Sequence, residues 1–424
     1  MRAIVTEGPE ITLSGVKKVQ RLASKVQKAQ PLPLIDGYAL ILSDEEIRDL
    51  RMAGFDVIED ERIGIPPFPQ VPVRPAGAGY PTDELDPSTP GPMRQMLDCE
   101  VEEALLRGYT GKGVEIGLVD TGTDDIHPDL AGKLSFFKDF VSGIDEPTDP
   151  HGHGTACAGM AVGMGAVVPK FHGTAPTATY SMARVLAEDG YGYSSWIIQG
   201  LDWLAHQNVD IISVSIGSPN PDYTILSRAL DRLARQDIIV CVAAGNWGPS
   251  NCISQPANAY GGITCAACDQ DGNHCRFSSV GPATGLNGER LPKPDVMWWG
   301  QNVALLRAAG TTMGQVISDH AGKSLPYVIG DGTSFSTPGI AGMAALLLES
   351  GMPREEIKIA LMSSAAANPD HTYEQEGAGN PRIAAAIDRN YKPIPPSPPA
   401  PKPQWYHTSC LVAKMGLGWG VPTF

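Results

Sequence analysis

Three short segments of this 424-residue chain carry side chains that could transfer an acyl group to a serine. Asp120 follows the apolar run 114–119, His153 lies between two glycines, and Ser334 precedes a run of small residues that is typical of a buried helix. Acyl transfer needs a nucleophile, a base and a group that orients the base, and these converge in space rather than in sequence. Each segment could supply one of the three groups.

Each of these residues also has an ordinary structural interpretation. An isolated Asp-Thr-Gly such as the one at Asp120 is more often a capped turn, and a lone histidine is usually a polar group with satisfied hydrogen bonds. A serine at a helix start is normally an N-cap, and Ser336 is the more plausible cap here. The free N–H groups of the first turn would then face a charge that develops next to Ser334. The three segments together favour catalysis.

The chain between residues 95 and about 390 alternates apolar strands with helical stretches. We predict strands at 114–119, 211–216, 238–243 and 263–268, and helices at 195–205, 226–234 and 337–348. Such alternation predicts an α/β fold, in which a parallel sheet has helices on both faces. Ligands of open α/β sheets bind at the carboxyl edge of the strands, and Asp120 falls at that edge.

The chain divides into five segments. The apolar pattern of residues 1–65 predicts a small α/β unit, with helices at 16–26 and 44–54 and strands at 38–43 and 55–60. Proline and glycine dominate residues 66–94, which predicts an extended linker. Residues 95–392 form the predicted main domain, and a second proline-rich stretch at 393–404 separates a tail at 405–424.

The composition narrows the possible partners. The formal net charge is −15 at pH 7, which argues against nucleic acid because phosphate binding needs clustered Lys and Arg. We find no apolar signal segment near Met1 and no run approaching the ~20 apolar residues of a membrane helix, so no membrane partner is expected. The eight cysteines are then expected to be reduced thiols of a cytoplasmic protein. Secretion is the alternative if a leader was removed.

The three motifs, in the order Asp, His, Ser, resemble those of the subtilisin-like serine proteases. The matching residues are Asp120-Thr-Gly, Gly152-His153-Gly-Thr155 and Gly332-Thr-Ser334-Phe-Ser-Thr-Pro338. The resemblance spans roughly residues 95 to 390, and it implies a parallel sheet between helices and a serine endopeptidase with Asp120, His153 and Ser334 as its triad. It also implies that the side-chain amide of Asn246 and the backbone N–H of Ser334 stabilise the oxyanion.

The same resemblance implies where a peptide or protein substrate binds. One wall of the primary specificity pocket would consist of Ser215, Ile216 and Gly217. The opposite wall would consist of Ala244 and Gly245, with Ser254 near the floor. A medium or large uncharged side chain is expected in such a pocket. The edge strand that pairs with the extended peptide would contain Gly190, Tyr191 and Gly192.

The N-terminal unit resembles the inhibitory pro-region of this family. Its linker begins with Ile65-Pro-Pro-Phe68, which is a candidate plug for the cleft because a proline at the scissile position resists the geometry of acylation. Intracellular subtilisins, to which the chain is similar, use a proline-containing segment in this way. The resemblance therefore implies a self-inhibited zymogen, and the alternative is a docked domain without an inhibitory role.

Two other functions compete with that of an endopeptidase. A catalytically silent protein of the same fold would bind peptides without cleaving them, and the presence of Asp120, His153, Ser334 and Asn246 argues against it. An α/β-hydrolase esterase is excluded because Ser334 lies in Gly-Thr-Ser-Phe-Ser and not in a Gly-x-Ser-x-Gly elbow.

This chemistry requires no cofactor, and we assign no metal ligand. Family members commonly hold calcium in a loop after the histidine helix, and such a site needs several oxygen ligands. Residues 163–171 offer no carboxylate or amide side chain, and Asp129 alone matches a ligand, so we expect this site to be absent or degraded. Calcium elsewhere remains open.

Several cysteines and tryptophans invite further functions. Cys157 stands where proteinase K-like members of the family carry a cysteine, and it is expected to be a small buried hydrophobic residue. The adjacent Trp298 and Trp299 are expected to fill the core. A third group consists of Cys252, Cys265, Cys268, His274 and Cys275, whose residue types could form a zinc site. Free thiols or a disulfide are favoured over zinc for these cysteines, because spacing motifs alone often mislead.

Overall fold

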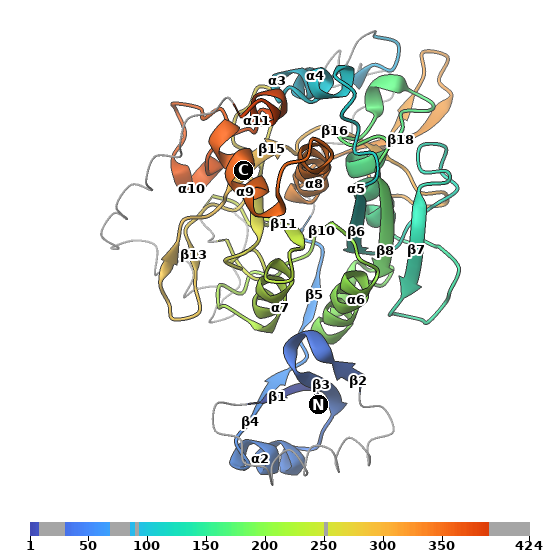
Figure 1. Cartoon of the computed structure of the whole chain (residues 1–424). Helices are drawn as coiled ribbons and strands as arrows, with labels where there is room; N and C mark the ends of the chain where they lie inside the picture. The colour runs from blue at the N-terminus through green and yellow to red at the C-terminus, as the bar shows by residue number, and fades with distance from the viewer. Residues whose placement is uncertain (8–29, 68–84, 90–92, 250–252, 390–424) are drawn as a thin grey trace, which may run out of the picture.

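The computed structural model describes residues 1–7, 30–67, 85–89, 93–249 and 253–389. Its centre is a seven-stranded sheet in which all neighbouring strands are parallel, in the order β15-β12-β11-β10-β6-β8-β7 (Figure 1). The strands are β6 (Glu115–Asp120), β7 (Leu134–Asp139), β8 (Thr179–Arg184), β10 (Ile211–Val214), β11 (Ile239–Ala243), β12 (Ile263–Cys268) and β15 (Val296–Trp299). The predicted parallel sheet is confirmed.

Helices cover both faces of this sheet (Figure 1). One face packs against α5 (His153–Val162) and α8 (Thr333–Glu349), and the other packs against α6 (Ser194–His206) and α7 (Ile225–Ala234). Successive residues of one strand therefore enter different cores, as Ile211 and Ile212 of β10 do. Burial on both faces explains why the strands are continuous apolar runs.

Smaller elements surround the central layers. The antiparallel strands β16 (Val303–Leu306), β17 (Gln315–Ser318) and β18 (Ser324–Gly330) form a sheet that leads directly into α8. The others are α3 (Arg94–Asp98), α4 (Val101–Leu106), η3 (Pro169–Phe171), β13 (Ala283–Thr284), β14 (Arg290–Leu291), α9 (Arg354–Ser364), α10 (Tyr373–Glu376) and α11 (Ile383–Ile387). Within the described residues, we find no helix that is both long and apolar enough to cross a membrane.

The N-terminal unit is a separate antiparallel sheet in the order β2-β3-β1-β4. Its elements are β1 (Arg2–Glu7), β2 (Gln30–Leu32), η1 (Pro33–Ile35), β3 (Gly37–Ile41), α2 (Asp44–Met52) and β4 (Phe55–Glu59). Helix α2 begins at a capping box, in which Ser43 and Glu46 satisfy each other's backbone N–H groups. The predicted strand–helix–strand order is confirmed, and the helix predicted at 16–26 lies outside the described residues.

This unit packs beneath α6 and α7 of the main sheet (Figure 1). The Asp60 carboxylate accepts hydrogen bonds from the backbone N–H and the hydroxyl of Ser195, at 2.9 and 2.8 Å, in the first turn of α6. A carboxylate is favoured there because the helix N-terminus carries positive partial charge. Arg232 of α7 contacts Asp36 at 2.6 Å. These contacts fix the direction in which the chain leaves the unit.

The start of helix α8 differs from the prediction. The helix begins at Thr333, four residues before the predicted Thr337, and its N-cap is Gly332. The prediction that Ser336 caps the helix was wrong, because its hydroxyl lies inside the helix and donates to the carbonyl of Trp298 at 2.9 Å. Trp298 and Trp299 are both buried, so the prediction that they fill the core is confirmed.

A buried carboxylate joins the last two strands of the sheet. Asp295 accepts from the Lys293 ammonium at 2.6 Å, from the Lys358 ammonium at 3.0 Å and from the Thr264 backbone N–H at 2.7 Å. Burial lowers the pKa of Lys293 to about 8. Burial opposes the charge of Asp295 as well, but the two ammonium groups hold its pKa below the usual value. The cluster stays charged at neutral pH.

Replacing Asp295 with alanine should destabilise the fold strongly. The change leaves the buried Lys293 ammonium without its counter-charge, so the free energy of unfolding should fall by about 3–5 kcal/mol. Chemical denaturation followed by circular dichroism measures this. Asp271→Ala is the control, because its ion pair with Arg94 is exposed and should contribute little. Equal losses in the two variants would contradict a structural role for the buried cluster.

Candidate active site

Asp120 and His153 meet at the carboxyl edge of the sheet. Asp120 is the last residue of β6, and His153 is the first residue of α5. The imidazole Nδ1–H donates to Asp120 Oδ1 at 2.7 Å, and both side chains are buried. This hydrogen bond fixes the tautomer, so Nε2 carries the lone pair and can accept a proton. The structure thus joins two of the three predicted residues directly.

Asp149 holds the two segments that carry this pair. Its carboxylate accepts from the Thr121 hydroxyl at 2.8 Å, next to Asp120, and from the Gly152 N–H at 2.8 Å, next to His153. It also accepts from the backbone N–H and the hydroxyl of Thr155, at 2.8 and 2.7 Å, and from the His151 N–H at 3.3 Å. One buried carboxylate therefore receives five donors from both sides of the pair.

The backbones of these segments also touch. A Cβ on Gly154 would lie 2.1 Å from the carbonyl oxygen of Gly122, and a Cβ on Gly122 would lie 1.8 Å from the carbonyl oxygen of Thr148. Only glycine allows such an approach. The Thr121 hydroxyl further accepts from the Gly154 N–H at 2.9 Å. The glycines beside the two motifs are therefore required by packing, independently of any catalytic role.

Ser334 lies in the first turn of α8 and is fully buried. Its carbonyl would normally accept from the N–H of residue 338, but Pro338 has none. The Ser215 hydroxyl donates to this carbonyl instead at 2.8 Å, and the Cys157 thiol lies 3.4 Å from it. The backbone of Ser334 is thus held from outside the helix.

The Cys157 thiol contacts both Ser334 and His153. Cys157 lies 3.9 Å from His153 Nε2 and also contacts Ser334, and the ring centroids of His153 and Phe335 are 5.7 Å apart. Ser334 Oγ has no hydrogen bond within the described part of the chain. Catalytic hydrogen bonds are often long before substrate binds.

Asn246 follows β11 and faces the start of α8. Its Oδ1 accepts from the Thr333 backbone N–H at 2.9 Å and from the Thr333 hydroxyl at 2.8 Å. Because these donors fix the orientation of the amide, Nδ2 is left to donate toward the cleft. There Nδ2 donates to the carbonyl oxygen of Pro67 at 3.3 Å. A donor placed in this way can stabilise an oxyanion.

The predicted substrate edge is paired with the chain's own N-terminal segment. Strand β9 (Tyr191–Tyr193) runs antiparallel to β5 (Arg62–Gly64), with Ile63 opposite Gly192 and Gly64 opposite Tyr191. Ile65 N–H then donates to the Gly190 carbonyl at 3.0 Å. Figure 1 shows β5 reaching from the N-terminal unit into the main domain. The segment occupies the position predicted for an extended peptide.

The opposite side of this segment contacts the predicted pocket wall. Gly217 N–H donates to the Gly64 carbonyl at 3.0 Å, so β5 lies between two edges of the main domain. The predicted wall residues Ile216 and Ala244 and the predicted floor residue Ser254 are buried. A Cβ on Gly217 would lie 3.2 Å from the carbonyl oxygen of Gln255, which places the segment after Ser254 beside this wall.

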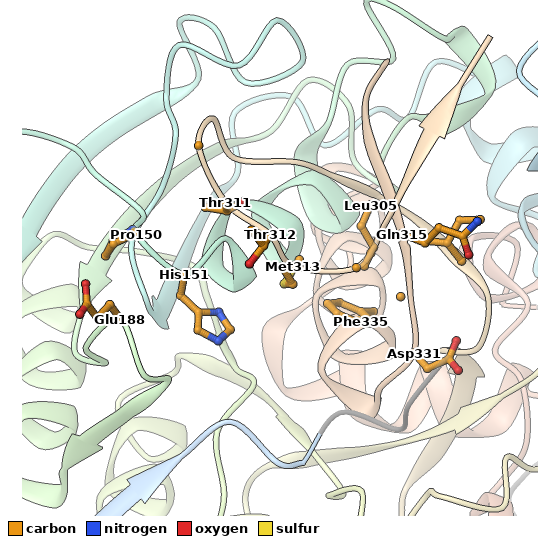
Figure 2. A pocket seen from close by; sticks show the side chains of 14 residues that line it. Pro150, His151, Glu188, Leu305, Thr311, Thr312, Met313, Gln315, Asp331 and Phe335 are labelled. Carbon is orange, nitrogen blue, oxygen red and sulfur yellow. The ribbon is translucent and has the colours of Figure 1, made fainter. Parts of the chain in front are cut away.

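A cavity of about 590 Å³ lies beside His151, two residues before His153 (Figure 2). His151 and Glu188 line one side, and Phe335 and Asp331 line the other. The ring centroids of His151 and His153 are 6.2 Å apart. Burial lowers the pKa of His151, and the nearby His153 adds to the shift, so His151 is neutral at neutral pH. It lines the cleft without adding charge beside the base.

The side chains near the site make contacts within the protein. Asp120, His153 and Cys157 lie close enough together to hold one ion, but Asp120 accepts the hydrogen bond from His153 and the Cys157 thiol contacts the Ser334 carbonyl. Burial raises the pKa of that thiol well above its usual range, with Asp120 adding to the effect. Asp129 binds protein donors instead, the Ala166 N–H at 2.8 Å and the Tyr327 hydroxyl at 2.9 Å.

The remaining cysteines of the zinc hypothesis are free and buried where the structure describes them, namely Cys265, Cys268 and Cys275. Cys252 lies outside the described residues.

Sequence reasoning missed two residues of the site. Asp149 lies four positions before His153, and Trp247 follows Asn246 directly. The acidic Asp149, so close to a glycine-flanked histidine, could have been recognised from the sequence as part of the site. Trp247 could not, because only its contacts in the folded protein place it there.

An imidazole oriented by a carboxylate, beside a buried serine at a helix start, is the arrangement of a serine hydrolase. Comparison with known proteins gives the family. Residues 111–379 match the model of the subtilase family. The chain is 35% identical over 318 residues to serine protease AprX of Bacillus subtilis, covering 68% of this chain and 70% of that protein.

It is also 31% identical over 291 residues to subtilisin DY of Bacillus licheniformis, covering 68% of this chain and 96% of that protein. Subtilisin BL of Lederbergia lenta is 33% identical over 253 residues, covering 60% of this chain and 82% of that protein. The chain belongs to the subtilase family and is a serine endopeptidase. The fold and function implied by the motifs are thereby confirmed, and catalysis in this family needs no cofactor.

Removing the Asp149 carboxylate should lower kcat with little effect on KM. Asp149→Ala leaves five donors unpaired and loosens the segments of Asp120 and His153, and small displacements of catalytic groups cost about 10²-fold in rate. Steady-state kinetics on a peptide substrate measures the change. Asp145→Ala, in the same loop but exposed, is the control. An unchanged kcat in folded Asp149→Ala would show that the pair keeps its geometry without this residue.

Proposed function

We propose that this endopeptidase hydrolyses peptide bonds with Ser334 as nucleophile, His153 as base and Asp120 as the group that orients the base. The observation that carries the proposal is the 2.7 Å hydrogen bond between His153 and Asp120 beside the buried Ser334. It leaves one imidazole nitrogen as the acceptor for the serine proton. Membership of the subtilase family supports the same roles.

In the acylation step Ser334 Oγ attacks the scissile carbonyl carbon while His153 Nε2 takes the hydroxyl proton. Asp120 stabilises the imidazolium that forms. The imidazolium then protonates the leaving amine as the C–N bond breaks, which leaves an acyl-enzyme. Water deprotonated by the same histidine hydrolyses this ester and regenerates Ser334.

Asn246 is proposed as the oxyanion donor. Thr333 holds its Oδ1, so Nδ2 is directed to the place where the carbonyl of Pro67 lies. The backbone N–H of Ser334, in the first turn of α8, is the proposed second donor. Such donors act because they are fixed before the charge develops.

Covalent labelling tests this assignment. A phosphonofluoridate should modify Ser334 in protein freed of residues 1 to about 90, and the same protein with Ser334→Ala should show neither labelling nor peptide hydrolysis. Asn246→Ala in this form should still be labelled but lose about 10²–10³ in kcat, a range known from subtilisin itself. Peptide mapping by mass spectrometry locates the label. Persistent hydrolysis by Ser334→Ala would overturn the assignment, and a freed protein that binds peptides but stays unlabelled would favour the catalytically silent alternative.

We further propose that the full-length chain is a self-inhibited form of the enzyme. Ser334 and His153 are both 0% exposed, and residues 62–67 run along the cleft in hydrogen-bonding distance of Gly190, Gly217 and Asn246. Residues 66 and 67 are both proline, so these two residues offer no backbone N–H to the cleft. The bound segment imitates a substrate but lacks part of its hydrogen-bonding pattern.

Substituting Gly64 should release the inhibition. A Cβ at this position would lie 2.6 Å from both the Gly190 carbonyl oxygen and Cδ1 of Tyr191. Gly64→Ala should therefore displace β5 and raise the initial rate on a short peptide severalfold. Arg48→Ala, exposed on α2, is the control and should not change the rate. If Gly64→Ala is no faster than wild type before any self-cleavage, β5 does not limit access to the cleft.

Cytoplasmic location remains a proposal. All six cysteines in the described ranges are buried and unpaired, as is usual in a reducing compartment. Subtilases often bind calcium, and we propose that this chain lacks the family's usual tight site. The support is that Asp129 already binds Ala166 and Tyr327.

A further inference from the structure

We propose that Trp247 fills the primary specificity pocket, so that the enzyme prefers a small side chain or proline immediately before the scissile bond. The proposal rests on the endopeptidase function described above. It differs from the sequence-based expectation of a medium or large side chain, which considered the walls and Ser254 but not the residue after Asn246. The inference rests on how closely the indole approaches Gly217 and Gly245.

The indole ring of Trp247 contacts both walls of the pocket. A Cβ on Gly245 would lie 2.0 Å from Trp247 Cζ3 and 2.3 Å from its Cε3. On the opposite wall, a Cβ on Gly217 would lie 3.1 Å from Trp247 Cη2 and 3.7 Å from Cζ3. The same edge of one six-membered ring is therefore in contact with both glycines. The ring therefore occupies space that adjoins both walls.

An aromatic or long substrate side chain needs the space that the ring occupies. Carbon atoms in contact keep about 3.5–4.0 Å apart, so a second ring does not fit between Gly217 and Gly245 while Trp247 is there. An alanine or proline side chain extends far less from its Cα and does not have to enter the gap. The indole of Trp247 thus occupies the space in which a large substrate side chain would bind.

The backbone around Trp247 is held in place. The Trp247 N–H donates to the Ser279 hydroxyl at 3.3 Å, and the Gly248 N–H donates to the Phe277 carbonyl at 2.8 Å. On the other side the Gly245 carbonyl accepts from the Ser279 N–H at 2.9 Å. The stretch from Phe277 to Ser279 thus anchors the residues on either side of the indole. Rotating the ring out of the pocket would expose an apolar surface, which costs free energy.

The chain's own bound segment agrees with this preference. Asn246, the residue before Trp247, donates to the carbonyl of Pro67, so proline is the residue whose carbonyl lies at the proposed oxyanion site. Pro66 precedes it. Both residues at this point of the bound segment therefore carry the compact proline side chain that the inference expects.

Competing peptides measure the preference directly. Two substrates identical except for Ala or Phe before the scissile bond are given to the full-length chain, and the ratio of kcat/KM is determined. This ratio does not depend on what fraction of the enzyme is self-inhibited. Wild type should prefer Ala at least tenfold. Trp247→Ala should raise kcat/KM for the Phe peptide at least tenfold and change that for the Ala peptide less than threefold.

Two further variants complete the test. Trp247→Leu, which retains an apolar side chain, should give an intermediate ratio, and Trp203→Ala, a partly buried tryptophan of α6, should leave the ratio unchanged. A wild-type enzyme that prefers Phe, or a ratio unaffected in both Trp247 variants, overturns the inference. The failure of the endopeptidase proposal looks different, because then neither peptide is cleaved and Ser334 is not labelled.

Discussion

The catalytic geometry depends on one buried carboxylate that does no chemistry. Asp149 accepts hydrogen bonds from residues next to Asp120 and next to His153, and so sets the distance between two segments about thirty positions apart. Unpaired, a buried charge would be costly, but five donors satisfy it. The glycines of both segments let the two backbones touch, so backbone packing and the Asp149 carboxylate together hold the segments in place. The hydrogen bond from His153 to Asp120 is then a result of how these segments are tied.

A hydrogen bond from outside the helix also holds Ser334, the proposed nucleophile. Pro338 deprives the Ser334 carbonyl of its helical hydrogen bond, and the Ser215 hydroxyl, from the proposed pocket wall, donates to it instead. The proposed wall and Ser334 are thereby joined directly. Asn246 adds the third side by binding Thr333, the neighbour of Ser334. Substrate position and catalytic position are set by one group of hydrogen bonds, which suits a reaction that needs the scissile carbonyl in a fixed place.

Apolar periodicity predicted the sheet and three of the four helices that cover it, because it records local requirements. The short motifs supplied the four residues that we propose do the chemistry. Sequence reasoning failed where a long-range contact decides. Ser336 looked like an N-cap, but its hydroxyl donates to the carbonyl of Trp298, and the helix starts earlier. Trp247 gave no signal, because its position depends on Gly217, thirty residues away. The wall residues stay a prediction, and the space between them could not be known from their identities.

Strand β5 is part of the same molecule as the edge β9 with which it pairs. While the chain is continuous, the local concentration of the segment at the cleft is set by the tether and not by the amount of protein in solution. A single cut between β5 and the main domain would turn the segment into an ordinary ligand, subject to mass action. Dilution alone would then distinguish the two forms, since only the severed one could lose the bound segment by being spread through a larger volume.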